Sequence, residues 1–176
     1  MTAPVLEGAI RQIGYVVRDL DAAIASWCAL GVGPWFTIRS MQQRGCRYRG
    51  ALSEPTLSIA FSNSGPMQIE LIQQHDDEPS IFREFLDAGH HGFHQLAWWV
   101  PDFDAMLARA DAAGWSAVFS GDGGGATRFV YFELDPTIST IIEVTELNDA
   151  TRGLAELVER AAADWDGITD PVRPLF

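Results

Sequence analysis

Two stretches of sequence that repeat each other decide the fold of this protein. Residues 10–36 read IRQIGYVVRDLDAAIASWCALGVGPWF, and residues 93–119 read FHQLAWWVPDFDAMLARADAAGWSAVF. Each stretch begins with a short apolar run typical of a strand, continues through an Asp-x-Asp segment into a helical pattern, and then reaches a Gly. At a constant offset the two copies share identical residues, which indicates an internal duplication; among the pairs are Gln12/Gln95, Val17/Val100, Asp19/Asp102, Asp21/Asp104, Ala22/Ala105, Gly31/Gly114 and Phe36/Phe119.

Each copy carries its own start and stop signals for a helix. Asp19 and Asp102 are suited to the N-cap, because a short carboxylate accepts a hydrogen bond from a free first-turn N–H. Gly31 and Gly114 suit the helix C-terminus.

Strand-like segments separated by turn residues follow each helix. We predict strands at 35–41, 46–52, 56–62 and 67–73 in the first half, and at 117–120, 128–134 and 140–146 in the second. The chain then divides into a first module at 8–74, a linker at 75–92 with a short helix at 80–88, a second module at 93–147, and a C-terminal helix and tail at 148–176.

Four motifs resemble the vicinal oxygen chelate superfamily, which includes glyoxalase I, methylmalonyl-CoA epimerase, extradiol dioxygenases and bleomycin-resistance proteins. The motifs are IGYVVRDLDAAI, GPMQIELI, FHQLAWWVPDFDA and TIIEVTEL, and the resemblance covers about residues 8–147. It implies an α+β fold in which two tandem βαβββ modules enclose a cavity, here followed by the C-terminal helix and tail. It also implies a homodimer.

The resemblance places the family's four metal ligands at Gln12, Glu70, Gln95 and Glu143. The third ligand is usually His, and here it is Gln95, so the preceding His94 is an alternative ligand. One reading is that a divalent metal ion binds. Ligands that are all oxygen atoms favour Mg²⁺, Mn²⁺ or Ca²⁺, whereas a ligand set that includes His94 favours Zn²⁺, Ni²⁺ or Fe²⁺. The other reading, of equal weight, is that no metal binds.

Strand alternation tests which of these side chains meet. Successive side chains of a strand point to opposite faces of the sheet. If the apolar side chains next to Gln12 and Gln95 pack on the helices, the two Gln side chains both face the cavity. His94 points away from the cavity unless a bulge shifts it.

The resemblance to the family's lyases and epimerases implies proton transfer next to a carbonyl, for which Glu143 is the candidate base and Glu70 its partner. With a metal, the ion would hold the substrate's oxygens and stabilise the enediolate. Without one, mutual repulsion would raise the pKa of one carboxylate, and Gln12 and Gln95 would donate N–H groups to the oxyanion. Both routes predict a lyase or isomerase. The alternative is a non-catalytic protein that sequesters a small molecule, as bleomycin-resistance proteins do.

Aromatic and basic residues suggest the class of ligand. A cavity rich in rings favours a bulky apolar or aromatic compound, and the arginines are candidates to hold an anionic group on it. The predicted substrate-binding residues are Trp99, Trp35, Tyr48, Phe61, Arg47, Arg49 and Arg128. The glycine-rich stretch 121–126 is a candidate gate.

Composition excludes several other functions. The 176 residues carry a formal net charge of -12, which disfavours nucleic-acid binding. All twelve basic residues are Arg, so no catalytic lysine exists. No apolar run is long enough to span a membrane, and the N-terminus lacks a signal-peptide pattern, so we expect a cytoplasmic protein in which Cys28 and Cys46 are free thiols.

Overall fold

The computed structural model describes residues 4–138 and 140–175, and its first half forms one βαβββ unit. The unit consists of β1 (Gln12–Val16), α1 (Leu20–Ala29), β2 (Trp35–Gln42), β5 (Thr56–Ser64) and β6 (Met67–Gln74). Its strands lie in the order β2-β5-β6-β1, with β1 and β6 parallel and the other neighbours antiparallel.

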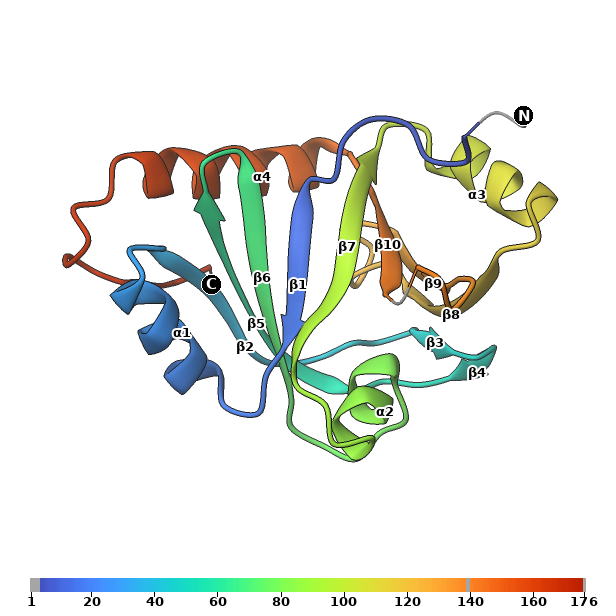
Figure 1. Ribbon diagram of the computed structural model, residues 1–176, viewed down its shortest axis with the longest axis horizontal. Coiled ribbons are helices and arrows are strands. Elements are labelled where there is room, and N and C mark those ends of the chain that lie inside the picture. The colour runs from blue at the N-terminus through green and yellow to red at the C-terminus, as the bar shows by residue number, and fades with distance from the viewer. Residues whose placement is uncertain (1–3, 139, 176) are drawn as a thin grey trace.

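The second half repeats this arrangement. It consists of β7 (Gly92–Val100), α3 (Phe103–Ala112), β8 (Ser116–Gly121), β9 (Phe129–Glu133) and β10 (Ile141–Glu146). Its strands lie in the order β7-β10-β9-β8, and β7 pairs with β1 in antiparallel fashion, so that both units share one sheet (Figure 1). The predicted α+β fold with two tandem βαβββ modules is therefore confirmed.

Both repeated helices begin where the sequence predicts. The Asp19 carboxylate accepts a hydrogen bond from the Ala22 N–H at 2.9 Å, and the Asp102 carboxylate accepts one from the Ala105 N–H at 2.9 Å. The duplicated Asp residues thus act as equivalent N-caps.

The predicted single strand at 46–52 is wrong, because it is a hairpin of β3 (Arg47–Tyr48) and β4 (Ala51–Leu52). The turn residues Arg49 and Gly50 have φ angles of 46° and 85°, the left-handed pair of a type I′ turn. β3 then pairs with β8, so an insertion from the first unit extends the sheet of the second.

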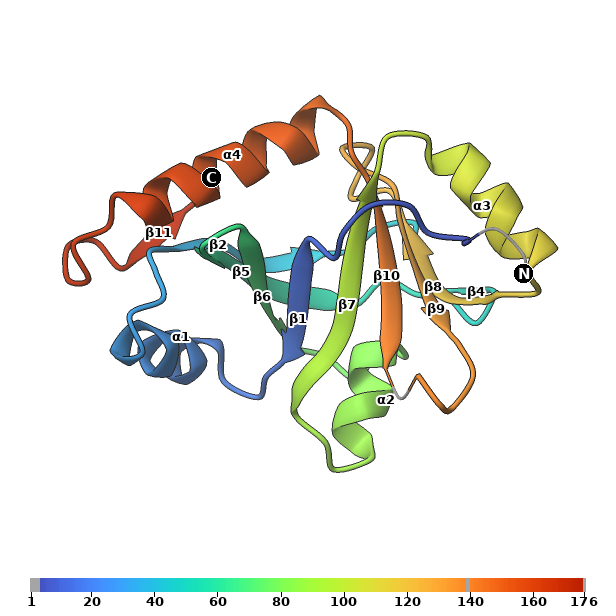
Figure 2. The same ribbon diagram turned by 45° about the horizontal axis from the view of Figure 1, so that its top comes forward.

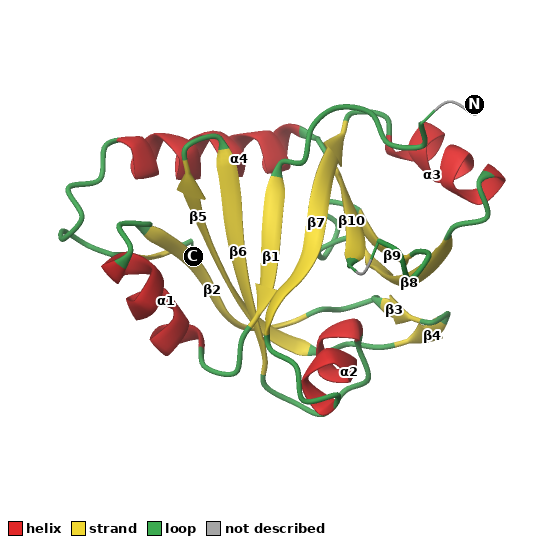
Figure 3. Cartoon of the chain, viewed as in Figure 1, coloured by secondary structure: helices red, strands yellow, loops and turns green. Residues whose placement is uncertain are grey.

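The two faces of the sheet have different roles. On one face α1 and α3 cover separate apolar clusters, which we call the helix face. The opposite face, the cavity face, is partly covered by α2 (Ile81–Asp87) and by α4 (Asp149–Ala163), whose Val158 packs on Phe36 and Phe61. Figure 2 shows α4 running across the first unit, and Figure 3 shows the helices placed around the central strands.

The C-terminal tail docks on its own chain. Its strand β11 (Val172–Pro174) pairs in parallel with β2, and the Leu175 N–H donates to the Thr37 carbonyl at 3.0 Å. Within the described ranges, no helix is long and apolar enough to cross a membrane.

Candidate active site

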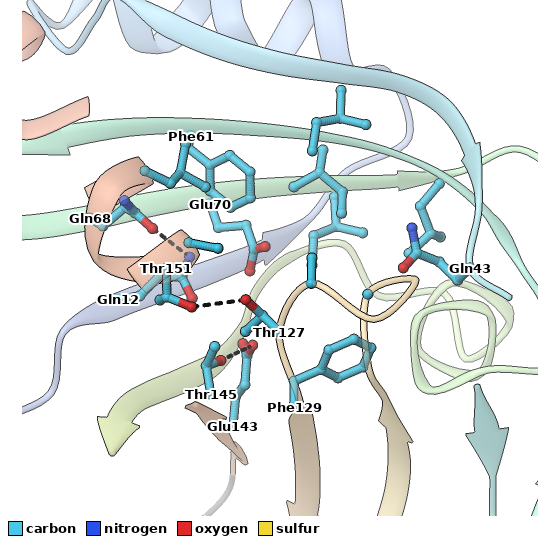
Figure 4. Close-up of a pocket in the computed structure, with 18 of the residues that line it drawn as sticks. Gln12, Gln43, Phe61, Gln68, Glu70, Thr127, Phe129, Glu143, Thr145 and Thr151 are labelled. Carbon is cyan, nitrogen blue, oxygen red and sulfur yellow. Dashed lines mark hydrogen bonds between the residues drawn. The ribbon is translucent and has the colours of Figure 1, made fainter. Parts of the chain in front are cut away.

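The cavity face encloses a cavity of about 390 Å³ whose walls come from both units, α2, α4 and the tail. Most of the lining is apolar. The polar side chains gather at a few points of the wall, as Figure 4 shows: Gln12, Gln43, Gln68, Glu70, Thr127, Glu143, Thr145 and Thr151. Such a cavity suits a largely apolar small molecule held by a few polar contacts.

The four central strands bring the predicted site residues together. Gln12, Glu70, Gln95 and Glu143 lie on β1, β6, β7 and β10, which are neighbours in the sheet, and all four side chains are buried. The alternation argument placed Gln12 and Gln95 on one face of the sheet, and the structure has them on neighbouring strands with the two carboxyl groups.

The Gln95 amide lies between the two carboxylates. Its Nε2 donates to Glu70 Oε2 at 3.1 Å and, more weakly, to Glu143 Oε2 at 3.4 Å. Its Oε1 is 2.5 Å from His94 Nδ1. Because an amide oxygen only accepts, Nδ1 carries the proton in this contact.

His94 reaches Gln95 because β7 contains a bulge. Tyr15 pairs with Phe93 and Gly14 pairs with Gln95, so His94 is the extra residue between them. Its ring packs on Phe82 and Phe85 of α2, with centroid distances of 5.7 and 4.9 Å. His94 is therefore turned by a bulge, but it contacts Gln95 and α2 rather than lining the cavity.

Burial strongly perturbs the pKa of both carboxyl groups. The pKa of Glu70 is raised well above its usual value, first by burial and then by the nearby charge of Glu143. Burial raises the pKa of Glu143 to about 7, although N–H and O–H donors from Thr145, Tyr131 and Gln95 oppose the shift. Two carboxyl groups buried side by side thus favour one proton between them near neutral pH.

Tyr131 is a neighbour of this pair that the sequence analysis missed. It lies on β9 directly opposite Glu143, and burial together with the Glu143 and Glu70 charges raises the pKa of its hydroxyl well above the usual value. The neutral hydroxyl is a hydrogen-bond donor to Glu143. Extending the alternation argument to β9 would have found it.

Gln68 is a second residue that the sequence analysis missed, and it accepts a hydrogen bond from Gln12. The Gln12 Nε2 donates to Gln68 Oε1 at 2.8 Å, across the parallel pair of β1 and β6 (Figure 4). This bond uses one of the two N–H groups of Gln12, whereas both N–H groups of Gln95 point to the carboxylates. The use of the two amides as oxyanion donors stays a prediction.

The observed donor set does not fit the predicted metal ion. Gln95 turns its oxygen to His94 and its N–H groups to Glu70 and Glu143, so it offers no lone pair to a metal at the pair. Among residues 4–138 and 140–175, no group of three or more His, Cys, Asp or Glu is placed to hold an ion. We therefore derive no chemical step through a metal.

The predicted aromatic contacts divide between the two faces. Phe61 and Trp99 line the cavity. Trp35 faces the other way and packs under α1, where its indole N–H donates to the Val32 carbonyl at 3.0 Å. Tyr48 does not line the cavity: it lies on β3, next to the edge strand β4, and its hydroxyl donates to Glu84 at 2.7 Å.

The three predicted arginines also lie outside the cavity. Arg49 is in the hairpin turn and pairs with Glu84 and Glu133, whereas Arg47 donates to the Gly50 carbonyl within the same hairpin. Arg128 pairs with Asp104 and Glu146 on the surface. Surface carboxylates pair with Arg49 and Arg128, and none of the three arginines lines this cavity, so their contact with a substrate anion stays a prediction.

The glycine-rich stretch borders the cavity mouth. Gly123, Ala126 and Thr127 line the cavity, and the Thr127 hydroxyl is 3.0 Å from the Thr151 hydroxyl on α4 (Figure 4). This hydrogen bond connects the loop to α4. Gating by the loop stays a prediction.

Comparisons with known proteins agree with this architecture. The chain is similar to methylmalonyl-CoA epimerase from Mycobacterium tuberculosis, with 25% identity, a TM-score of 0.58, and coverage of 87% of this chain and 97% of that one. It is also similar in fold to a hypothetical protein from Bacillus halodurans C-125 (15% identity, TM-score 0.59, coverage 80% and 95%). A third structure of similar fold is Streptomyces coelicolor methylmalonyl-CoA epimerase in complex with 2-nitronate-propionyl-CoA (19% identity, TM-score 0.56, coverage of 78% of this chain and 93% of that one).

No curated protein matches the chain. The family model of the Glyoxalase/Bleomycin resistance protein/Dioxygenase superfamily matches residues 11–132, which is more than half of the sequence. The repeated units, the shared sheet and this match together show that the chain belongs to the Glyoxalase/Bleomycin resistance protein/Dioxygenase superfamily, the vicinal oxygen chelate proteins.

Proposed function

We propose that this protein is an isomerase or lyase that moves a proton at a carbon next to a carbonyl group, with Glu143 as the base and Glu70 as the acid. The observation that carries the proposal is the pair of buried carboxyl groups joined through one amide, Gln95, at the wall of an apolar cavity. Burial of two titratable groups in a cavity is typical of sites for acid–base chemistry.

The perturbed pKa values support different roles for the two groups. Burial and the charge of Glu143 raise the pKa of Glu70 well above its usual value, which favours its protonated form and suits a donor. Glu143, with a pKa of about 7, is ionised in a large fraction of molecules and is the acceptor. A base with a pKa near the working pH is the most effective kind.

The proposed step conserves atoms and electrons. The Glu143 carboxylate takes the proton from the carbon, the electron pair of the broken C–H bond moves to the carbonyl oxygen, and the Glu70 O–H stabilises that oxygen by hydrogen bonding. Donation of the Glu70 proton to the opposite face of that carbon, as the electron pair returns from the oxygen, yields the isomer and leaves the substrate's proton on Glu143. In a lyase, expulsion of a leaving group from the adjacent carbon follows instead.

The similarity to methylmalonyl-CoA epimerases supports an isomerase, because an epimerase removes and returns a proton. The substrate of those proteins is not carried over to this chain. Their ligands are anionic CoA thioesters, whereas Arg47, Arg49 and Arg128 lie outside the cavity of this protein.

The alternative is a non-catalytic protein that sequesters a small molecule. The apolar lining and the cover provided by α4 and the tail favour this reading, since both would also retain a bulky ligand. Tight binding without proton exchange would identify it.

Solvent-exchange measurements distinguish the two functions. Phenylacetone, an uncharged aryl ketone with acidic protons on both sides of its carbonyl, is incubated with the protein in deuterium oxide and followed by NMR. We expect deuterium incorporation that Glu143→Gln abolishes and that the control Glu159→Gln, on the exposed side of α4, leaves unchanged. Binding of phenylacetone by the wild-type protein without exchange would support sequestration instead.

We also infer that the protein acts on a small molecule in the cytoplasm as a homodimer. The family resemblance supports the dimer, and the acidic composition supports the absence of nucleic-acid partners. Light scattering on the purified protein measures the mass and tests the dimer.

A further inference from the structure

Strand β2 contains an extra residue that reverses its alternation beside the cavity. Ile38 pairs with Ile59 and Met41 pairs with Leu57, so the register shifts between them. Ser40 in this bulge has a φ angle of 50°, a left-handed conformation that is costly for a residue with a side chain. Bulges of this kind redirect the side chains that follow them.

The redirected side chains are Met41 and Gln43. Alternation from Ile38 without the bulge would turn Ser40 and Gln42 to the cavity. Instead Ser40 and Gln42 are exposed, and both Met41 and Gln43 line the cavity. The strained Ser40 thus places a polar amide in an apolar wall.

That amide has an unmet hydrogen-bonding requirement. Only 6% of the Gln43 surface is exposed, and its Nε2 has no hydrogen-bond partner among the described residues. The backbone N–H of Gln43 is already satisfied by the Pro55 carbonyl at 2.9 Å. A buried donor without an acceptor destabilises the fold, so its presence calls for a partner from outside the chain.

The geometry allows such a partner in the cavity. A half-turn of the amide about its last torsion exchanges Nε2 and Oε1 without moving the rest of the side chain. The N–H groups then face the cavity, and the oxygen, which is tolerated without a partner more readily than an N–H group, takes the enclosed position. Figure 4 shows Gln43 at one end of the cavity, away from Glu70 and Glu143. A ligand that contacts both ends must therefore be elongated.

The charges around the cavity define the acceptor as neutral. Within the described residues, the lining contains no Arg, Lys or His, but it contains two carboxyl groups. A ligand carboxylate or phosphate would enter without a compensating cation, at a large desolvation cost. A carbonyl oxygen accepts two N–H bonds without that cost.

We propose that Gln43 is a specificity-determining residue that binds a neutral hydrogen-bond acceptor on the distal end of the substrate. The ligand class is an uncharged, elongated, mainly apolar molecule with an ester, ketone or amide oxygen at Gln43. Its second carbonyl lies at Glu70 and Glu143, and this placement rests on the proposed function.

The binding test uses two probes that differ only in the acceptor. Phenylacetone with a para-methoxycarbonyl group offers an acceptor, and its para-sec-butyl counterpart has the same number of heavy atoms but no acceptor. Titration calorimetry should show that the wild-type protein binds the ester about tenfold more tightly, the difference expected for one buried hydrogen bond. Gln43→Leu should remove this preference, and the control Gln42→Leu, at the exposed neighbour, should retain it.

A second measurement needs no ligand. Because Gln43→Leu removes an unpaired buried donor, the Tm of the ligand-free variant should rise by about 2–4 °C, with no such rise in Gln42→Leu. A fall in the Tm of Gln43→Leu overturns the proposal, as does equal affinity of the wild-type protein for the two probes or failure to bind the ester.

The affinity test of Gln43 and the exchange test of the proposed function can fail independently. Preference for the ester without deuterium exchange would refute proton transfer and leave the role of Gln43 in place. Exchange with equal affinity for both probes would refute the role of Gln43 alone.

Discussion

The Gln95 side chain lies directly over Gly14 on the neighbouring strand. The two residues are register partners in β7 and β1, and a Cβ atom added at Gly14 would lie 2.1 Å from Gln95 Nε2. The missing side chain of Gly14 therefore leaves the space that the amide needs to reach Glu70 and Glu143.

Gly14→Ala should displace the Gln95 amide and reduce turnover by about 100-fold, since a shift of about 1 Å in a catalytic site has effects of that size. Single-turnover kinetics in deuterium oxide measures the loss. The matched control is Gly153→Ala, because a Cβ atom at Gly153 on α4 meets nothing within 4 Å. Equal activity of the two variants would show that the Gln95 position is not required.

The raised pKa of Glu143 predicts how stability depends on pH. A carboxyl group with a pKa of about 7 in the folded protein, above its ordinary value, gives stability that is present at low pH and is lost as pH rises through about 7. The loss is on the order of 3 kcal/mol for a shift of this size. Urea unfolding should show Glu143→Gln more stable than the wild-type protein at pH 8, with a smaller difference at pH 5. A constant difference across this range would contradict the prediction.

The same group should control the pH dependence of turnover. If ionised Glu143 is the base, the exchange rate rises with pH and reaches half of its plateau near pH 7. Rates measured between pH 5 and 9 test this. A flat profile at constant affinity would exclude Glu143 as the base.

His94 is expected to act as a positioning residue. His94→Phe keeps an aromatic ring on Phe82 and Phe85 but removes the donor to Gln95 Oε1. The freed amide should support the carboxylates less well, which lowers kcat about tenfold or more and moves the midpoint of the pH profile upward. His94→Asn, which can still donate a hydrogen bond, should restore part of kcat and part of the original midpoint. An unchanged midpoint in His94→Phe would indicate a packing role only.

Chelation should not affect the activity, because the Gln95 amide presents N–H groups to the carboxylates and its oxygen to His94. Exchange activity is compared before and after dialysis against EDTA, with elemental analysis of both samples. Loss of a stoichiometric metal together with the activity would contradict this prediction, and would mean that the Gln95 amide rotates so that its oxygen coordinates the metal.

The repeat and the alternation of side chains were sufficient to predict most of the fold and the centre of the site. Local signals specify these features, because an Asp caps its own helix and a period of two assigns each side chain to a face. Glu70 and Glu143 were selected through the family resemblance, and both are buried at the cavity.

Three features departed from the local pattern because of non-local structure. The type I′ turn at Arg49 directs its guanidinium to Glu84 and Glu133, although a continuous strand was predicted there. The bulge at His94 places its ring against Gln95. The bulge at Ser40 turns Gln43 into the cavity, and no sequence pattern marked that position.

The sequence by itself determined the duplicated modules and the shared face of Gln12 and Gln95, and its family resemblance pointed to Glu70 and Glu143. Only the tertiary structure decided the direction of the Gln95 hydrogen bonds, the cover of the cavity by α4, and the unpaired amide of Gln43. The physical reason is that periodicity assigns a side chain to a face only while the register is unbroken. Bulges, the pairing of β3 with β8 and the docking of α4 depend on contacts between residues far apart in the chain.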